Sequence, residues 1–321
     1  MTLLSVENLS IRFGTPDGDV HAVNDVSFDI AAGETVALVG ESGSGKSQIA
    51  LSILGLLAPN ARTSGRIMYG GRDLLSLKRR ELNKVRAKEI AMIFQDPMSS
   101  LNPYMTIERQ LNESLELHEG LRGAAARKRV LEVLDAVQIP DARNRLRAYP
   151  HEFSGGMRQR IVIAMALLCN PKLILADEPT TALDVTVQAQ IMRLLDDIRR
   201  DMGTAILLIT HDLGVVAGSC ENTLVLYSGK VMEHAPTRAL FAEPQHPYTR
   251  GLLRAVPNIH DEAGALHAIP GQPPNTMRAL TGCPFAPRCV DAIAACHQIV
   301  PPLEGDALRQ RACIRPVEEL T

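Results

Sequence analysis

A glycine-rich stretch near the start of the chain has the residue types and the spacing of a phosphate-binding loop. Residues Gly40–Ser47 read GESGSGKS and match the pattern G-x-x-x-x-G-K-[ST]. In this pattern backbone N–H groups surround the phosphates, the lysine reaches the β- and γ-phosphates, and the last hydroxyl ligates Mg²⁺. A dinucleotide fingerprint is excluded because Gln48 stands where its third glycine would be. The residues expected to contact ATP here are Gly40, Ser42, Gly43, Ser44, Gly45, Lys46, Ser47 and Gln48.

Two adjacent carboxylates supply the acidic groups that a magnesium–nucleotide site needs. Asp177 and Glu178 follow the apolar run Leu173–Ala176, which predicts a strand that ends at the pair. We expect Asp177 to hold Mg²⁺, directly or through water, together with the Ser47 hydroxyl. Glu178 would then polarise the attacking water as the general base. The alternative is an ordinary Asp-Glu pair at a strand end that caps a helix.

The stretch FSGGMRQR offers a second anion-binding helix start. Ser154 stands at the expected N-cap, Gly155 and Gly156 follow, and a helix is predicted from Met157 onward. Free N–H groups and the positive end of the helix dipole favour an anion at such a start. Since the chain's own phosphate loop already serves its own nucleotide, we expect this start to serve the nucleotide of a facing chain. The pattern therefore predicts a dimer with ATP at the interface.

Four of the six cysteines fall in the last 39 residues. Their spacing is C-x5-C-x6-C-x16-C, at Cys283, Cys289, Cys296 and Cys313. A structural zinc site usually begins with a closer pair, and disulfides are disfavoured in a reducing compartment. Four thiolates on a proline-rich loop suit an iron–sulfur cluster, whose negative charge Arg288 could offset. Zn²⁺ and unligated thiols are the alternatives, and Cys169 and Cys220 are expected to be inert.

The hydrophobic pattern places the elements that must position these residues. Thr35–Val39 predicts a buried strand before the phosphate loop, and Ile49–Leu54 continues as a helix after it. Residues of about 3–30 alternate in polarity, which predicts a β-rich start. A helical subdomain is expected over about 96–162, inserted into the α/β core.

The chain is therefore predicted to contain an α/β nucleotide-binding domain over residues 1–235, with an antiparallel β subdomain. From Pro236 the sequence becomes proline-rich, which predicts a linker and a cysteine-rich C-terminal extension over 236–321. His246 and His267 are expected to be exposed loop residues.

Charge and hydropathy limit the classes of partner. Lys and Arg total 34 against 36 Asp and Glu, so no nucleic acid is expected to bind through net charge. The longest apolar run, Ile161–Cys169, is nine residues long and too short to span a bilayer. The first ten residues have no basic region, so no signal peptide is expected. These features predict a soluble chain in the cytosol.

Together the motifs identify the chain as similar to the ATP-binding-cassette (ABC) ATPases. The phosphate loop, Gln95, FSGGMRQR, LILADE, ALD and THD stand in the order and spacing of that family. The resemblance implies that Phe13 stacks on adenine and that His211 contacts the γ-phosphate. It also implies that Gln95 senses Mg²⁺ as a ligand and that Asp184 lies at the dimer interface. The trans ATP contacts would then be Ser154, Gly155, Gly156 and Asp184.

Three functional classes of such ATPases differ in features that a sequence contains. Chromosome and repair ATPases that act on nucleic acid need a long coiled-coil insertion. Only about 108 residues separate Gly45 from Ser154, without sustained heptads. Translation-type ATPases carry two cassettes, and this chain has one set of motifs. The remaining class is the motor subunit of a membrane importer whose channel consists of separate chains.

Further stretches resemble the peptide-importer branch of the family, which also includes importers of dipeptides, nickel and other solutes. They are FQDPMSSLNP, YPHEFSGGMRQR, HPYTRGLL, TPDGDVHAVND and GCPFAPRC. They bring the chain nearest to the D-type ATP-binding subunit of bacterial oligopeptide importers. The resemblance implies a peripheral position on the cytoplasmic face of the inner membrane. It also implies a second homologous ATPase subunit, two transmembrane permease subunits, an extracytoplasmic peptide-binding protein and a [4Fe–4S] cluster at the four cysteines.

Overall fold

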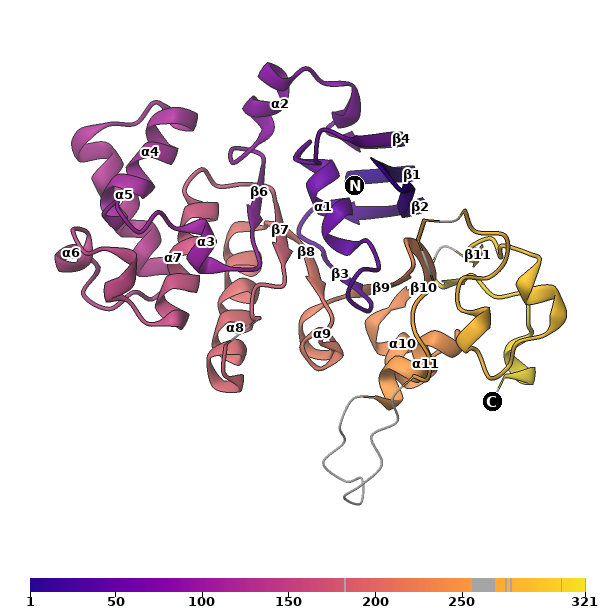
Figure 1. Ribbon diagram of the computed structural model, residues 1–321. Coiled ribbons are helices and arrows are strands. Elements are labelled where there is room, and N and C mark those ends of the chain that lie inside the picture. The colour runs from indigo at the N-terminus through magenta and orange to yellow at the C-terminus, as the bar shows by residue number, and fades with distance from the viewer. Residues whose placement is uncertain (182, 256–268, 275, 278, 307, 321) are drawn as a thin grey trace. The chain divides into compact units, whose positions relative to one another are not determined.

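The computed structural model describes residues 1–181, 183–255, 269–274, 276–277, 279–306 and 308–320 (Figure 1). The chain forms two compact units. Unit 1 consists of Met1, Ala31–Glu34 and Leu77–Leu208. Unit 2 consists of Thr2–Ile30, Thr35–Ser76 and Ile209–Thr321.

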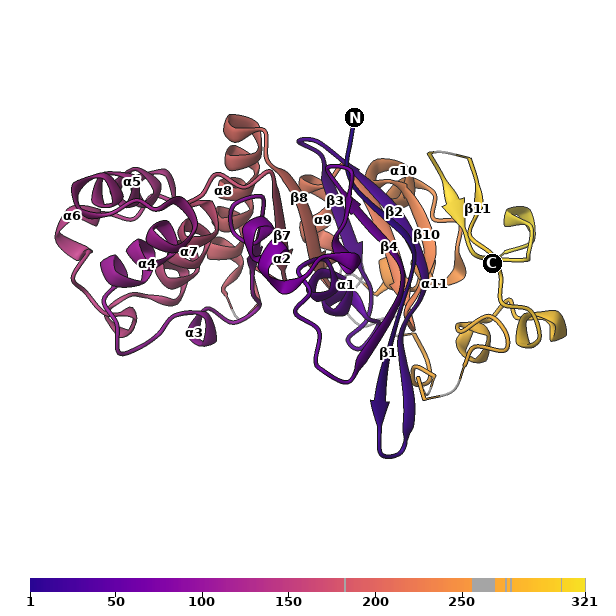
Figure 2. The ribbon, with the colours of Figure 1, turned by 90° about the horizontal axis from the view of Figure 1, so that it is seen from above.

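Unit 2 begins with an antiparallel sheet in the order β2-β1-β4-β5. Its strands are β1 (Thr2–Thr15), β2 (Gly18–Ala31), β4 (Ala61–Tyr69) and β5 (Arg72–Asp73). Figure 2 shows the hairpin of its two long strands, β1 and β2, from above. A bulge at Asn8, whose φ is 51°, shifts the register of β1 against β4. Because the bulge adds one residue, Val6 and Leu9 both face the core despite their odd spacing. The β-rich start predicted from the alternating pattern is confirmed.

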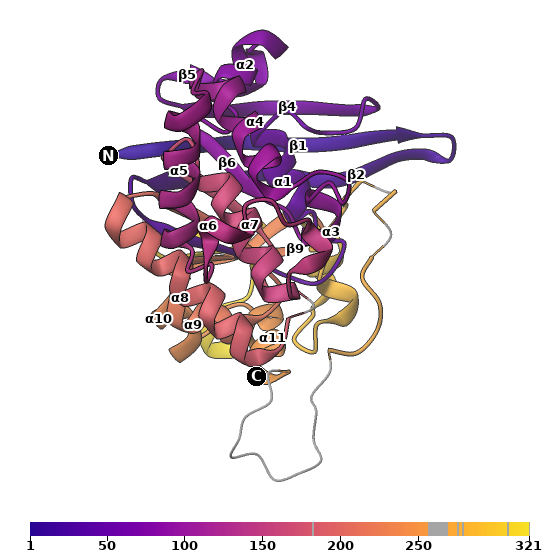
Figure 3. The ribbon, with the colours of Figure 1, turned by 90° about the vertical axis from the view of Figure 1, so that its left-hand side faces the viewer.

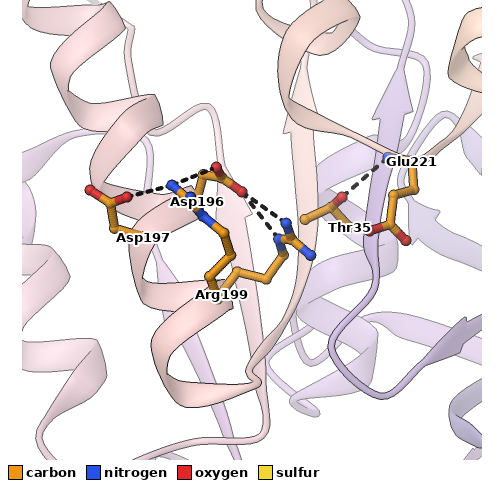
Figure 4. Close-up of polar contacts among 6 residues, drawn as sticks. Thr35, Asp196, Asp197, Arg199 and Glu221 are labelled. Carbon is orange, nitrogen blue, oxygen red and sulfur yellow. Dashed lines mark hydrogen bonds and ion pairs between the residues drawn. The ribbon is translucent and has the colours of Figure 1, made fainter.

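The second sheet of unit 2 contains the strand that leads into the phosphate loop. Its strands within unit 2 follow the order β11-β12-β10-β9-β3. The strands are β3 (Thr35–Val39), β9 (Asn222–Tyr227), β10 (Lys230–Pro236), β11 (Glu304–Gly305) and β12 (Gln310–Arg311). β3 and β9 run parallel, and all five residues of β3 are buried, as in a parallel strand covered on both faces. Thr35 Oγ1 accepts a hydrogen bond from the Glu221 N–H at 3.1 Å (Figure 4), which fixes the start of this pair.

The helices of unit 2 cover this second sheet. They are α1 (Lys46–Ile53), α9 (Leu213–Ser219), α10 (Thr237–Ala242) and α11 (Pro247–Arg254). Helix α9 packs on β3, and α10 and α11 pack on β10. Short 3₁₀ helices lie at Leu74–Ser76, Ala286–Arg288, Ala294–His297 and Val317–Glu319.

Unit 1 contains strands in the order β8-β7-β6. It also contains a group of helices, which lie toward the viewer in Figure 3. The strands are β6 (Ile90–Ile93), β7 (Leu173–Asp177) and β8 (Ala205–Thr210), whose last two residues belong to unit 2. The helices are α2 (Arg79–Val85), α3 (Pro97–Ser100), α4 (Ile107–Glu119), α5 (Gly123–Ala136), α6 (Ala142–Arg145), α7 (Gly155–Leu167) and α8 (Val185–Met202). A 3₁₀ helix lies at Pro150–Glu152. Helix α5 packs against α4, α6 and α7, so helices occupy the region expected to form the helical subdomain.

Helix α8 is amphipathic, with one buried apolar side and one more exposed polar side. Ile191, Leu194, Leu195 and Ile198 recur with helical spacing and are buried. On the more exposed side, Arg199 bonds Asp196 one turn earlier, 3.0 Å from Nη2 to Oδ1 (Figure 4). Gly203 ends the helix in the left-handed conformation that glycine adopts without strain.

The C-terminal segment belongs to the same unit as the phosphate loop. Strand β12 pairs with β10, and the Ala312 N–H donates to the Met232 carbonyl at 2.8 Å. Tyr248 and Phe285 join the buried cluster that also contains Val39 of β3. The predicted division at residue 235 stays a prediction. Within the described ranges, no helix is both long and apolar enough to cross a membrane.

The expectation that His246 is an exposed loop residue is wrong. His246 is 1% exposed and caps α11, because its Nδ1 accepts a hydrogen bond from the Tyr248 N–H at 3.0 Å. Sequence composition suggested a loop, but the cap residue of a buried helix is itself buried. His267 lies outside the described residues.

Candidate functional site

The phosphate loop follows β3 and leads into α1 within unit 2. Gly40 has a φ of 154°, and a Cβ added there would lie 2.1 Å from the Leu226 carbonyl oxygen. Gly45 has a φ of 100°, and its Cβ would lie 2.3 Å from the Ala22 carbonyl oxygen. No side chain fits at either position, so the loop can follow this path only with glycine at both ends.

The centre of the loop has the donors that a polyphosphate needs. Lys46 is 6% exposed, and its Nζ donates to the carbonyls of Gly40 and Glu41 at 2.7 and 2.9 Å. The buried Ser44 Oγ has no hydrogen-bond partner among the described residues. Helix α1 starts at Lys46 without a side-chain cap, and the positive end of its dipole favours an anion at this point. Ser42 and Gly43 are exposed, whereas Ser47 and Gln48 are half-buried in the first turn. This arrangement fits the phosphates of a nucleotide.

The two predicted carboxylates stand at the end of β7 in unit 1, as the apolar run predicted. Asp177 is 7% exposed. Glu178 has a φ of 47°, in the left-handed region that residues other than glycine rarely adopt. Its Oε2 accepts hydrogen bonds from Gln95 Nε2 at 2.9 Å and from Thr181 Oγ1 at 2.8 Å. The structure therefore brings together two of the residues assigned to catalysis, and both bonds fix the direction of the Glu178 carboxylate.

The predicted second anion-binding helix start is α7, also in unit 1. Ser154 is the N-cap, and its Oγ accepts from the Met157 N–H at 3.4 Å. Ser154 and Gly155 are exposed, so another chain can reach them. Gly156 is packed against α8, where an added Cβ would lie 2.7 Å from Val187 Cγ1. Asp184 caps α8 by accepting from the Val187 N–H at 2.9 Å.

The other predicted nucleotide contacts lie in unit 2. His211 directly follows β8 and is exposed. Phe13 is half-buried near the end of β1, opposite Ala61 of β4. The site residues divide by unit: those of unit 1 are Gln95, Ser154, Gly155, Gly156, Asp177, Glu178 and Asp184, and the rest are in unit 2.

The four C-terminal cysteines line one cavity in unit 2. Burial raises the pKa of Cys283 and of Cys289 to about 11, which favours the neutral thiols. Across the described parts of the chain, however, no three Cys, His, Asp or Glu residues are arranged to hold a metal ion. The geometry of the side chains therefore gives no support for a [4Fe–4S] cluster or for Zn²⁺.

Arg288 does not have the surroundings expected of a counter-charge to a cluster. Its guanidinium pairs with Glu41 of the phosphate loop, 2.8 Å from Nη1 to Oε2. Sequence reasoning also missed Thr181, which bonds Glu178, and Tyr248, whose hydroxyl accepts from the Glu41 N–H. Thr181 lies in the same motif as Glu178 and could have been found by its spacing. No local signal connects Arg288 or Tyr248 with Glu41.

Known protein families match two parts of the chain. Residues 23–181 match the family described as ABC transporter, and residues 232–296 match the oligopeptide/dipeptide transporter C-terminal region. The first match includes the phosphate loop, the helix start at Ser154 and the carboxylates at the end of β7.

Similar proteins span almost the whole chain. The oligopeptide transport ATP-binding protein OppD of Salmonella typhimurium is 57% identical and covers 99% of this chain and 95% of its own length. OppD of Escherichia coli is 56% identical and covers 99% of this chain and 94% of its own length. The dipeptide transport ATP-binding protein DppD of Bacillus subtilis is 50% identical and covers 93% of this chain and 90% of its own length.

Solved structures agree with these relatives. A dimeric post-hydrolysis state of the ATP-binding cassette MJ0796, bound to ADP and Pi, is 30% identical with a TM-score of 0.65. The match covers 73% of this chain and 99% of that cassette. The cbiO1 protein of Clostridium perfringens, part of an ABC transporter complex, has the same identity and TM-score. The match covers 75% of this chain and 91% of cbiO1. The mixed α/β fold of this chain is thus that of ATP-binding cassettes.

Proposed function

Because the chain belongs to the ABC transporter family, among its ATP-binding proteins, we propose that it is the ATP-hydrolysing motor subunit of a bacterial oligopeptide importer. The observation that carries the proposal is the Glu178 carboxylate. Gln95 and Thr181 hold it directly after a strand that ends in the buried Asp177. A general base needs such a fixed direction, and a lone carboxylate at a strand end does not have it.

We propose a role for each residue of the site. Lys46 and the N–H groups at the start of α1 bind the phosphates, and Phe13 stacks on the adenine. Ser47, Gln95 and Asp177 would hold Mg²⁺, which neutralises phosphate charge when bound. Glu178 accepts the proton of the attacking water, and His211 contacts the γ-phosphate.

We propose that a second, homologous ATPase subunit completes the site. Ser154 and Gly155 are exposed at a helix start, where N–H groups can bind the nucleotide of the facing subunit. Gly156 and the exposed Asp184 flank this surface. The dimeric state of the solved cassette MJ0796 supports an assembly of two ATPases.

The transport partners and the substrate follow from the relatives. Two transmembrane permease subunits and an extracytoplasmic peptide-binding protein would complete the importer, with this chain on the cytoplasmic face of the inner membrane. Relatives named for oligopeptide transport at 55–57% identity support oligopeptides as the substrate. The relative named for dipeptide transport, at 50%, supports dipeptides as the alternative.

A separate proposal concerns the four cysteines of the C-terminal extension. We propose that they bind a [4Fe–4S] cluster, with Zn²⁺ as the alternative. The support is that all four thiols, from separate positions between Cys283 and Cys313, line one cavity. Because they are not in a ligand arrangement, the thiols must reorient and lose their protons to bind metal.

The motor function is tested by nucleotide binding, hydrolysis and co-purification. Lys46→Ala removes the charge that faces the phosphates, so the Kd for ATP should rise ten- to hundredfold, as expected for charge-assisted hydrogen bonds. Affinity purification of the wild-type chain from membranes should yield a second ATPase and two permeases. A self-sufficient homodimeric ATPase that binds DNA would contradict the importer role.

A further inference from the structure

The side chain of Arg288 connects the C-terminal extension to the phosphate loop. Its Nη1 lies 2.8 Å from Glu41 Oε2 and 3.1 Å from the hydroxyl of Tyr227. Its Nε and Nη2 donate to the carbonyls of Pro270 and Ile269, at 2.9 and 3.1 Å. The side chain of Arg288 is 6% exposed and that of Glu41 is 25% exposed. An ion pair whose guanidinium is buried and bonded on three sides keeps its geometry far better than a surface pair does.

Tyr248 of α11 holds the same residue of the loop. Its hydroxyl oxygen accepts a hydrogen bond from the Glu41 N–H at 3.0 Å. Its ring is fully buried, and the ring centroids of Tyr227 and Phe285 lie 4.6 and 5.3 Å away. Phe285 and Arg288 lie in the same short segment of the extension. The amide and the carboxylate of Glu41 are therefore both held by residues that follow the ATPase motifs in sequence.

Glu41 in turn contacts the lysine of the phosphate loop. Lys46 Nζ donates to the carbonyls of Glu41 and of its neighbour Gly40. The direction of these two carbonyls therefore sets where the Lys46 ammonium lies. Gly40 is already confined by the Leu226 carbonyl. The Glu41 carbonyl accepts the Ser44 N–H within the loop at 3.2 Å. The amide and the carboxylate of Glu41 are held from outside the loop, by Tyr248 and Arg288.

We propose that Arg288 and Tyr248 are positioning residues that hold the phosphate loop in its nucleotide-binding conformation. The affinity for ATP then depends on the C-terminal extension. This inference rests on the ATP-binding role proposed above. Without these contacts the loop populates other conformations, and the apparent Kd rises by the reciprocal of the competent fraction. Saturating ATP selects the competent conformation, so kcat changes little.

The test measures binding of a fluorescent ATP analogue (mant-ATP) with Mg²⁺ to the full chain. For Arg288→Ala we expect the Kd to rise about tenfold, which corresponds to a competent fraction of about one tenth. Arg288→Lys keeps the positive charge but lacks the planar guanidinium with its several N–H donors, so it should recover part of the affinity for mant-ATP. The Kd of the double variant Arg288→Ala/Glu41→Ala should be no higher than the higher Kd of the two single variants, because both changes remove the same contact. In the transporter complex, KM for ATP should rise while kcat stays within about twofold.

Arg315→Ala is the matched control. Arg315 also anchors the extension, through the Asp291 carbonyl and Glu319, but none of its bonds reaches the phosphate loop. An equal rise in Kd for Arg315→Ala would overturn the inference, since the effect would then be general loosening of the extension. Unchanged Kd in both Arg288→Ala and Tyr248→Phe would also overturn it.

Two further outcomes are separable. If Arg288→Ala does not fold, Tyr248→Phe provides the test, because it removes one oxygen and leaves the buried ring. If the wild type fails to bind mant-ATP and Lys46→Ala is no different, the ATP-binding role itself is contradicted, and the inference falls with it. Wild-type binding together with normal binding by the positioning variants contradicts the inference alone.

Discussion

The amide nitrogen of Gln95 lies 2.9 Å from the Oε2 atom of Glu178. Thr181 donates to the same oxygen, and the Glu178 backbone has a φ of 47°. A left-handed conformation costs a residue with a side chain about 1 kcal/mol. It persists because contacts on either side of the residue determine its position. The two hydrogen bonds give the Glu178 carboxylate the fixed direction that the proposed general base needs.

Replacement of Glu178 by glutamine should separate ATP binding from hydrolysis. Glu178→Gln keeps the side-chain size and the contacts at its oxygen but cannot accept the proton of water. We expect kcat to fall by about 10²- to 10⁴-fold, with the Kd for ATP nearly unchanged. Steady-state hydrolysis and mant-ATP binding measure the two effects in the purified complex.

The control for this experiment is Glu132→Gln, which changes a half-exposed carboxylate on α5. The second ATPase of the complex should carry the equivalent change, so that its site does not hide the loss. Hydrolysis at the wild-type rate under these conditions would remove Glu178 from the role of general base.

The two glycines after Ser154 should respond differently to alanine. At Gly156 an added Cβ would lie 2.7 Å from Val187 Cγ1, so Gly156→Ala should lower the free energy of unfolding by about 1–3 kcal/mol through overpacking. At Gly155 the nearest atom is Leu183 Cδ2 at 3.9 Å, so Gly155→Ala should fold normally. Urea unfolding of each variant measures the difference.

A second measurement separates packing from contact with the facing subunit. Gly155→Ala should reduce ATPase activity only in the assembled complex, where the exposed helix start meets the nucleotide of the partner. The double variant Gly156→Ala/Val187→Ala should regain stability, because it removes the atom that clashes. Equal stability of the two single variants would contradict the packing argument.

Protonation of His246 should make stability depend on pH. Burial lowers its pKa to about 3, assisted by the charge of Arg311. Between pH 6.5 and 3 the unfolded chain binds a proton that the folded chain does not, so stability is lost as the pH falls through this window. The full loss is on the order of 5 kcal/mol.

Asparagine at this position is the informative variant. His246→Asn keeps a side-chain acceptor for the N-cap of α11 but does not titrate. Urea unfolding from pH 7 to pH 4 should then show a weaker fall in stability than in the wild type. His297→Asn changes an exposed histidine and should leave the profile as it was. Identical profiles for wild type and His246→Asn would show that His246 is not buried in the neutral form.

The six cysteines should divide by metal binding and not by thiol pKa, since burial raises the pKa of Cys283 and Cys289 to about 11 as well. Burial raises the pKa of Cys169 to about 11 and that of Cys220 to about 12, so both thiols should resist alkylation at pH 7.5 in the native protein. Protein purified without oxygen should be brown and contain about four irons per chain, if the four C-terminal cysteines bind a [4Fe–4S] cluster.

Serine variants check the assignment of the metal. Cys283→Ser should lose iron and colour, whereas Cys220→Ser should retain both. Colourless protein with one zinc would support the alternative metal, and protein without metal would leave four free thiols. None of these outcomes changes the ATPase assignment, because the cysteines and the ATPase motifs are separate stretches of sequence.

Much of the candidate site was predictable because its geometry is local. Thr35–Val39 is a strand, and Gly40 and Gly45 have φ values of 154° and 100°, a local backbone conformation that the glycines of the motif provide. Ser154 caps its helix by accepting a hydrogen bond from the N–H of Met157, three residues later in the sequence. Composition and spacing determine such features, since the interacting groups lie within a few residues of one another.

Tertiary structure alone decided the contacts between distant segments. Arg288 and Glu41 are 247 residues apart, and no pattern in either segment indicates the other. The burial of His246 and the arrangement of the four thiols likewise depend on how the extension packs against the sheet of unit 2. A side chain's local sequence sets its chemistry, but the partner that satisfies a buried charge is chosen by the fold. The pair forms because burial makes an unpaired guanidinium or carboxylate costly, and packing brings these two groups together.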